Sequence, residues 1–417
     1  MQSTFYNIDS TKIPTSMLRK ILKGIKYLML FTLGAIALLI CYLLISNKTT
    51  LTLPIPTGPY TVARVTYDWK DDTRIDSLSP GAKEKREILV WIWYPSKKDS
   101  ATKSAEYMPE VERKELIKHR GIILSSLLTH AESKVICHSV DGGLVADNQR
   151  RYPVIILRSG LGAVATDYTT LAEELASHGY VVIGADAPYS TVLTVFPDGR
   201  VITRTREGNP GERAASEEQE RLCNNLVRYW SADVKTILDR LTYCSEQDSS
   251  SIFWHKLDLE AVGIVGHSFG GAAAAQACHD DPRIKAAIDM DGQPFGTVVS
   301  DGMDQPLMIL LGDHSHEDSV SAVKAKLHSL YDHTRAPQKL YLTIPSARHF
   351  NFSDQCLMKN TIMARSIGAI GPIAPRRDLA VAGNCVRAFF DVHLKHQSNS
   401  VFSSMLVQNP EITTSQR

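Results

Sequence analysis

A glycine-framed serine in the second half of the chain constrains the fold more than any other stretch. The β-branched run at residues 262–265 predicts a buried strand, and the small residues at 272–278 predict a helix packed closely on a sheet. Between them, Gly-His-Ser-Phe-Gly at residues 266–270 fits the sharp strand-to-helix turn that lifts a serine hydroxyl above a sheet. A side chain at either glycine would collide where strand and helix meet. We therefore interpret Ser268 as a nucleophile rather than as part of a merely structural turn.

Strand and helix patterns alternate on both sides of this turn. Buried strands are predicted at residues 154–157, 180–184, 286–290, 307–311 and 340–344, and helices at residues 168–179, 226–241 and 378–395. Earlier strands at 60–67 and 87–95 flank a charged segment, residues 70–86, that we expect to be a solvated loop. Such alternation predicts the α/β class, with a mostly parallel central sheet and helices on both faces.

The large globular part is predicted to form one domain over residues 57–395. Residues 96–150 interrupt the alternation of strand and helix patterns, and helical periodicity in this segment is patchy, from 112 to 128. We interpret this segment as a surface insertion and a candidate cap over the site. Residues 48–56 are expected to be a linker, and residues 396–417 a polar C-terminal tail.

The N-terminal segment predicts a transmembrane anchor. Residues 1–26 are basic, and residues 27–47 contain no charged side chain and are rich in leucine and isoleucine. At ~1.5 Å per residue this run spans the roughly 30 Å hydrocarbon core of a bilayer, which is long for a signal peptide or a buried core helix. A lipoprotein signal fits poorly because bulky Ile40 precedes Cys41. The basic flank favours a cytoplasmic N-terminus, so we expect a single-pass membrane protein whose large domain is periplasmic, lumenal or extracellular.

Composition argues against several other functions. The net charge of +1 gives no electrostatic reason to bind nucleic acid, and no nucleic-acid-binding motif is present. The seven cysteines show no Cys-x-x-Cys spacing, and the polar run at 314–318 is interpreted as a solvated loop because no second ligand cluster accompanies it. We therefore expect no metal and no cofactor. In an exported domain, the six cysteines beyond Cys41 could form up to three disulfides or remain buried thiols.

Serine becomes nucleophilic at neutral pH when a base takes its proton, and that base needs an orienting acid. In hydrolases built on such a sheet, an acid and then a histidine follow the serine on loops after later strands. His349 follows the strand at 340–344 and fits best. His267 is less suitable because its side chain should point away from its neighbour Ser268, and His279 and His393 lie on helices.

Spacing leaves the acid open between two aspartates. Asp291 lies just past the strand at 286–290, beside Gly292, where the chain can turn toward the site. Asp313 follows the next strand, which is the position that most hydrolases of this fold use. Asp289 is still within its strand.

An oxyanion hole needs two N–H groups aimed at the position where negative charge develops. Phe269, the residue after the serine, is expected to supply one, and Leu161 the other. Leu161 lies in the loop at 158–162, which follows an early strand. The alternative for this loop is a plain tight turn between strand and helix.

Taken together, these motifs resemble the plasma-type platelet-activating-factor acetylhydrolases (lipoprotein-associated phospholipases) and their bacterial relatives, over about residues 57–395. The carriers are Thr-Gly-Pro-Tyr at 57–60, Val-Trp-Ile-Trp-Tyr-Pro at 90–95, Gly-Leu-Gly-Ala at 160–163, Leu-Ala-Ser-His-Gly-Tyr at 175–180, Phe-Pro-Asp-Gly-Arg at 196–200, Gly-His-Ser-Phe-Gly-Gly-Ala at 266–272 and Asp-Met-Asp-Gly at 289–292.

The resemblance implies an α/β-hydrolase fold and a calcium-independent Ser-Asp-His triad. In this family the acid follows the strand after the elbow helix, which implies the triad Ser268, Asp291 and His349. It also supports Phe269 and Leu161 as oxyanion donors. Two residues depart from the family pattern: Ser159 and Ala187 stand where the family usually has histidine.

The function implied is that of a membrane-anchored serine esterase or lipase, of the 1-alkyl-2-acetylglycerophosphocholine esterase type. It would hydrolyse carboxylic esters, phospholipids with short or oxidised acyl chains among them, through an acyl-enzyme on Ser268. A polyester or dienelactone-type hydrolase, a peptidase and a catalytically silent binding protein on the same scaffold are the alternatives. The oligomeric state is left open.

Overall fold

The computed structural model describes residues 15–97, 103–120, 128–211, 216–315 and 320–414 of the chain. A twelve-stranded sheet forms the centre of the large domain, in the order β1-β5-β2-β3-β7-β6-β10-β11-β12-β13-β14, with β4 paired to β5. The strands from β7 to β13 in this order are mutually parallel, and β3 and β14 join them antiparallel. The mostly parallel α/β sheet predicted from the sequence is confirmed.

The strands are β1 (Leu51–Thr52), β2 (Thr61–Ile75), β3 (Lys85–Ser96), β4 (Ser104–Glu106), β5 (Val135–Asp141), β6 (Tyr152–Arg158), β7 (Val181–Ala185), β8 (Leu193–Val195), β9 (Val201–Thr203), β10 (Leu257–His267), β11 (Ile284–Met290), β12 (Leu307–Leu311), β13 (Lys339–Thr343) and β14 (Thr413–Thr414). The helices are α1 (Thr15–Ser46), α2 (Glu110–Arg120), α4 (Thr169–Ser177), α5 (Glu217–Glu246), α6 (Phe269–Asp280), α7 (Val298–Asp301), α8 (Val320–His333), α9 (Gln355–Met358), α10 (Thr361–Ser366), α11 (Pro375–His393) and α12 (Ser400–Gln408). Three short 3-10 turns are η1 (Glu132–Lys134), η2 (Ala165–Tyr168) and η3 (His349–Phe352).

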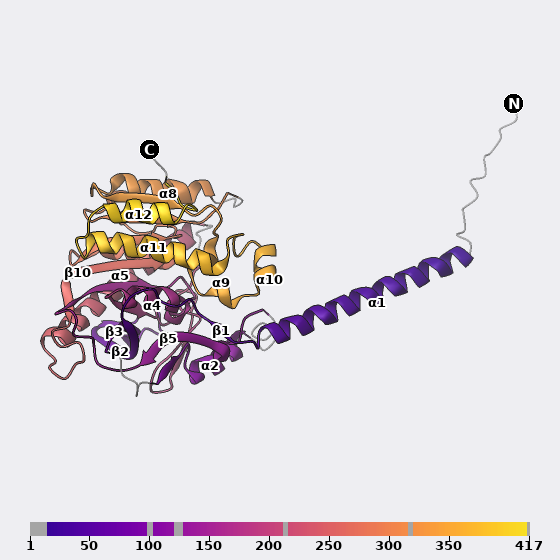
Figure 1. The fold of residues 1–417 in the computed structure, drawn as a ribbon, viewed down its shortest axis with the longest axis horizontal. Helices are drawn as coiled ribbons and strands as arrows, with labels where there is room; N and C mark the ends of the chain where they lie inside the picture. Colours follow the sequence, from indigo (N-terminus) through magenta and orange to yellow (C-terminus); the bar gives the residue numbers. More distant parts are fainter. Residues whose placement is uncertain (1–14, 98–102, 121–127, 212–215, 316–319, 415–417) are drawn as a thin grey trace, which may run out of the picture.

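Two hydrophobic cores lie on opposite faces of the sheet. One packs α4, α11 and α12 against it, and the other packs α5, α6 and α8 (Figure 1). Strands buried on both faces explain the continuous apolar runs that the sequence shows at residues 154–157 and 307–311. Because the parallel strands all end at the same edge, residues that are distant in the chain meet there.

The prediction of a solvated loop over residues 70–86 was wrong at both ends of that range, which belong to strands. β2 runs on to Ile75, and β3 already begins at Lys85. Arg86 is fully buried, and its guanidinium bonds Asp233 of α5 at 2.6 Å and Asp76 at 2.9 Å. Charge in the sequence was interpreted as exposure, whereas these charges neutralise one another inside the fold, as buried charges must.

Residues 96–150 extend the sheet over much of their length. β5 pairs with β2, β1 and β4 at one edge, and α2 lies beside them. Residues 98–102 and 121–127 lie outside the described part of the chain. The second of these ranges contains most of the second half of the helix predicted at 112–128. Whether this segment acts as a cap over the site stays a prediction.

The two segments assigned to a linker and a tail contain regular structure. Residues 51–52 form β1 and pair with β5. Residues 400–408 form α12, which packs against α11, and β14 pairs with the edge strand β13. All seven cysteines are free thiols, and five of them are buried: Cys137, Cys223, Cys278, Cys356 and Cys385.

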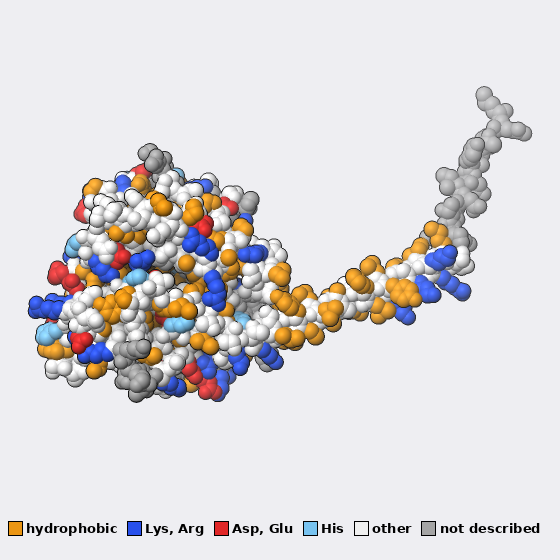
Figure 2. All heavy atoms as spheres, viewed as in Figure 1, with side chains coloured by type: hydrophobic (Ala, Val, Ile, Leu, Met, Phe, Trp, Pro, Cys, Tyr) orange, Lys and Arg blue, Asp and Glu red, His pale blue; other side chains and the backbone are white. Residues whose placement is uncertain are grey.

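Helix α1 extends away from the domain (Figure 1). It begins at Thr15 and so includes Arg19, Lys20, Lys23 and Lys26, which precede the apolar run at 27–47. Basic side chains lie at the far end of the helix in Figure 2. Its most apolar window has a mean hydropathy of 2.7, and Leu43 is the buried side chain of this helix. The helix is long and apolar enough to cross a membrane or to act as a signal sequence.

Candidate active site

Ser268 occupies a strained turn between β10 and α6. Its backbone has φ +58° and ψ −127°, a left-handed conformation that non-glycine residues rarely adopt. A Cβ at Gly266 would lie 2.0 Å from the carbonyl oxygen of Gly270, and a Cβ at Gly270 would lie 2.4 Å from that of Arg158. The predicted close approach of strand and helix is therefore confirmed at Gly266, whereas Gly270 packs against the end of the neighbouring strand β6.

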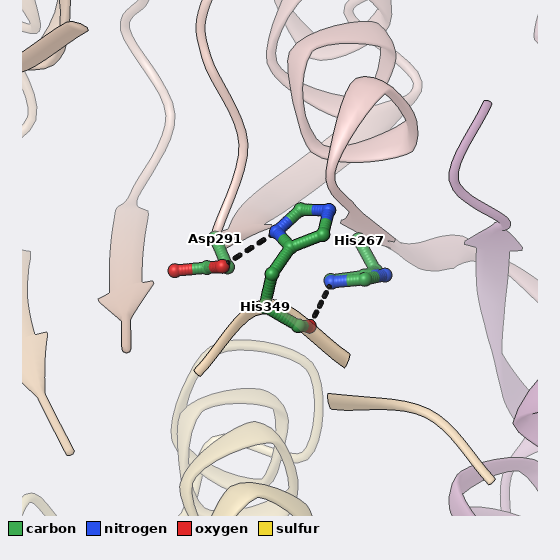
Figure 3. A group of neighbouring side chains, drawn as sticks. All are labelled: His267, Asp291 and His349. Atoms are coloured by element: carbon green, nitrogen blue, oxygen red, sulfur yellow. Dashed lines mark hydrogen bonds and ion pairs between the residues drawn. The ribbon is translucent and has the colours of Figure 1, made fainter. Parts of the chain in front are cut away.

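Asp291 and His349 meet at the carboxyl edge of the sheet (Figure 3). Nδ1 of His349 lies 2.7 Å from Oδ2 of Asp291, whose side chain is fully buried. A carboxylate can only accept hydrogen bonds, so Nδ1 of His349 carries the proton and Nε2 of the neutral ring is the basic nitrogen. In Figure 3 this second nitrogen points away from Asp291.

The carboxylate of Asp291 is held in its ionised form. Burial opposes ionisation, but hydrogen bonds from His314 and His349 outweigh it and hold the pKa of Asp291 well below its usual range. The backbone N–H of Gly312 adds a third donor at 2.8 Å. Asp291 itself has φ +55°, so the chain turns sharply as it leaves β11.

The other two aspartates considered for this role lie elsewhere in the site. Oδ1 of Asp313 accepts a hydrogen bond from the backbone N–H of Ser315 within its own loop. Asp289 lies in β11 as expected, beneath the elbow helix, where burial raises its pKa to about 8. Burial therefore favours the protonated form of this carboxyl. Of the three carboxylates, the structure brings that of Asp291 to His349.

The imidazole of His267 connects the two sides of the site. Its Nε2 lies 2.9 Å from the carbonyl oxygen of His349, which can only accept, so this nitrogen donates (Figure 3). Its Nδ1 then accepts from the hydroxyl of Tyr168 at 2.8 Å, and that oxygen accepts from the N–H of Gly160 at 3.0 Å. The sequence had suggested only that this side chain points away from the serine.

One ring nitrogen each of His267 and His349 and one carboxylate oxygen of Asp291 lie within 4.8 Å of one another. Such a group of ligand atoms deserves comparison with a metal site. Both nitrogens of His267 are used by hydrogen bonds, and Nδ1 of His349 is bonded to Asp291. These bonds fit a proton-transfer group better than a set of metal ligands.

His314 is the residue of this site that the sequence interpretation missed. Its position in a polar run suggested a solvated loop, and that prediction was wrong for this side chain. Nε2 of His314 lies 2.6 Å from Oδ1 of Asp291, and its side chain is only 17% exposed. The available signal was topological: β11 and β12 are parallel neighbours, so the residues that follow them share one edge.

The two rival histidines on helices lie outside this cluster. His279, near the end of α6, bonds the carbonyl oxygen of Gly302 through Nδ1. His393, at the end of α11, packs against Phe389, and burial lowers its pKa to about 4. Neither His279 nor His393 contacts Asp291 in these hydrogen bonds and ring contacts, which agrees with the choice of His349 as the candidate base.

The two predicted oxyanion donors lie in one buried cluster beside the elbow. Leu161 and Phe269 both belong to the apolar group around Trp230. Among the described residues, no hydrogen bond is formed by the backbone N–H of Leu161 or by that of Phe269. Buried N–H groups are rarely left without an acceptor, so this pair suits an acceptor supplied by a ligand.

The two positions that depart from the family pattern are enclosed. Ser159 is buried, and within the described part of the chain its hydroxyl has no hydrogen-bond partner. Ala187 is also buried, and its carbonyl oxygen accepts from Ser190 and Thr191.

The sheet, the strained serine turn and the paired histidine and aspartate at the carboxyl edge define an α/β hydrolase. Comparison with known families agrees. The chain belongs to the family described as platelet-activating factor acetylhydrolase, isoform II, whose model matches residues 45–228 and 230–410.

Individual relatives support the same class. A probable 1-alkyl-2-acetylglycerophosphocholine esterase of Arthroderma benhamiae is 26% identical over 391 residues, 86% of this chain and 92% of that protein. The platelet-activating factor acetylhydrolase of Bos taurus is 26% identical over 271 residues, which cover 60% of this chain and 59% of that protein. Among solved structures, a ferulic acid esterase from Streptomyces cinnamoneus superposes with a TM-score of 0.71 at 25% identity, covering 88% of this chain and all of that one.

Proposed function

We propose that this chain is a membrane-anchored serine esterase that forms an acyl-enzyme on Ser268. The observation that carries the proposal is the hydrogen bond between His349 and the buried Asp291, at the edge of the sheet where Ser268 stands on its strained turn. Asp291 fixes the tautomer in which Nε2 of His349 is the basic nitrogen.

The reaction follows from these roles. Nε2 of His349 takes the proton of the Ser268 hydroxyl while Oγ attacks the ester carbonyl carbon. The N–H groups of Phe269 and Leu161 bind the oxyanion that develops on the carbonyl oxygen. The imidazolium then gives its proton to the departing alkoxide, which leaves as an alcohol, and the acyl group stays on Oγ. The same histidine then takes a proton from water as the water oxygen attacks the acyl carbon, and it returns that proton to Oγ of Ser268 as the carboxylic acid leaves.

Phospholipids with short or oxidised acyl chains are the substrates that we favour. The support is family membership together with the activity named for the Arthroderma benhamiae relative, whose match covers most of both chains. An anchor in the bilayer would keep the domain close to lipid.

A panel of esters tests this substrate class. The purified full-length protein in detergent should hydrolyse a 2-acetyl or short-chain phosphatidylcholine with a higher kcat/KM than its long-chain counterpart and than p-nitrophenyl acetate. Calcium chelation should leave the rate unchanged. A preference for long acyl chains, or no turnover of any glycerophospholipid, would contradict the proposal.

Esters of other acids are the second candidate. The structural likeness to a ferulic acid esterase at a TM-score of 0.71 favours it, and the polyester and dienelactone-type alternatives belong to the same group. Methyl ferulate and a soluble polyester oligomer belong in the same panel. Turnover of either at a rate above that of every phospholipid would favour this candidate.

We also propose that α1 is a permanent anchor with its basic end in the cytoplasm. Its apolar side chains are exposed along the helix, as a lipid-facing helix requires (Figure 2). Four basic residues precede its apolar run: Arg19, Lys20, Lys23 and Lys26. The chain then enters the domain directly, because the carbonyl oxygen of Asn47 accepts from the N–H of Ala131.

Deletion of residues 1–46 should release the protein from membranes. We expect the shortened protein to be soluble and to hydrolyse p-nitrophenyl acetate like the full-length protein, because α1 contributes no residue to the site. Carbonate extraction and fractionation measure the first expectation, and an ester assay the second. The intact mass of the full-length protein is the control, since a mass that lacks the N-terminal segment would identify α1 as a cleaved signal sequence and refute the anchor.

A further inference from the structure

His314 bonds the carboxylate oxygen of the proposed catalytic acid that the proposed catalytic histidine does not use. It follows β12, and its Nε2 donates to Oδ1 of Asp291 at 2.6 Å, while His349 donates to Oδ2 at 2.7 Å. The two imidazole rings bond different oxygens of one carboxylate, and their centroids are 6.4 Å apart in an edge-on arrangement. These two hydrogen bonds connect His314 to His349 through Asp291.

The carboxylate is thereby fixed in rotation. Oδ1 accepts two hydrogen bonds from the segment after β12, from the N–H of Gly312 and from His314. Oδ2 is left facing His349. The carboxylate of Asp291 is fully buried, so loss of one donor would leave a charged oxygen without a hydrogen bond, which is destabilising. The carboxylate would then rotate to find another donor.

We propose that His314 is a positioning residue for the reaction: it holds Asp291 so that Oδ2 orients and stabilises the imidazole of His349. This inference rests on the proposed roles of Asp291 and His349. In most hydrolases of this fold, the catalytic acid follows the strand that corresponds to β12. Here the same loop supplies a donor to an acid that comes from β11, so two neighbouring strand ends build one catalytic carboxylate.

Two substitutions separate positioning from a role in folding. His314→Ala removes the donor, and His314→Gln replaces it with a neutral amide donor at similar reach. We expect His314→Ala to lower kcat for p-nitrophenyl acetate by about tenfold or more with little change in KM, because substrate contacts are intact. His314→Gln should recover most of that loss. His333→Ala, which removes an exposed histidine of α8, is the matched control and should behave as the wild type.

A double mutant identifies the path of the effect. If His314 acts through Asp291, adding His314→Ala to Asp291→Asn should lower the rate no further than Asp291→Asn alone. Circular dichroism and melting curves establish that each variant is folded. Should His314→Ala misfold, the comparison of His314→Gln with the wild type still decides, since a folded His314→Gln as slow as Asp291→Asn would overturn the inference.

The failures of the two proposals are distinguishable. If Ser268→Ala and Asp291→Asn lose turnover while His314→Ala keeps the wild-type kcat, the positioning role is refuted and the proposed function stands. The role is also refuted if His314→Ala slows the Asp291→Asn variant further. If Asp291→Asn keeps full turnover, the positioning role falls together with the assignment of the acid, while loss of turnover in Ser268→Ala would still support a serine esterase.

Discussion

Replacement of Ser268 by alanine should abolish ester hydrolysis, with a fall in kcat of roughly 10⁴- to 10⁶-fold. The hydroxyl is the proposed nucleophile, and no other side chain in this turn can take its place, so only the rate due to binding and to the oxyanion donors would remain. The fold should be unaffected, because removing one oxygen leaves the turn sterically unchanged. Release of p-nitrophenol from a short-chain ester measures the effect.

A fluorophosphonate probe provides the control for this result. The wild-type protein should be labelled covalently and the Ser268→Ala variant should not, while both melt at similar temperatures. Labelling of the variant, or turnover close to that of the wild type, would remove Ser268 from the mechanism and would require another nucleophile.

Asp291→Asn should cost about 10⁴-fold in kcat, whereas Asp313→Asn should have a small effect. The asparagine is similar in size, but its amide can present an N–H toward Nδ1 of His349 and favour the wrong tautomer. Asp313 instead accepts a bond from Ser315 in its own loop. Steady-state rates of the two variants, measured side by side, give the comparison.

The Asp313→Asn variant is the matched control, because it makes the same chemical change after the next strand. A large loss in that variant alone would reverse the assignment of the acid. Equal losses in both would mean that the loop after β12 controls the site as a whole rather than through His314.

Local sequence patterns were sufficient for the central parallel strands and for the serine turn. Strands buried on both faces show continuous apolar runs, and two glycines around Ser268 have a steric requirement that a sequence displays directly. Family resemblance then decided between Asp291 and Asp313, which spacing alone had left open. The pairing of Asp291 with His349 agrees with that choice.

Contacts between charged or polar side chains from distant parts of the chain could not be predicted from local sequence patterns. Arg86 was placed in a solvated loop, because a sequence does not show that Asp76 and Asp233 meet it in the interior. His314 was placed on a solvated surface for the same reason. The relay from Gly160 through Tyr168 and His267 to the carbonyl of His349 joins four positions that no local pattern connects.

The sequence by itself determined the fold class, the apolar N-terminal helix, the strained serine and the candidate base, because each depends on periodicity or on steric rules within a few residues. Only the tertiary structure decided which donors surround Asp291, since those donors come from separate strand ends. Hydrogen-bond directions and burial, and therefore the lowered pKa of this carboxyl, exist only once those ends are brought together.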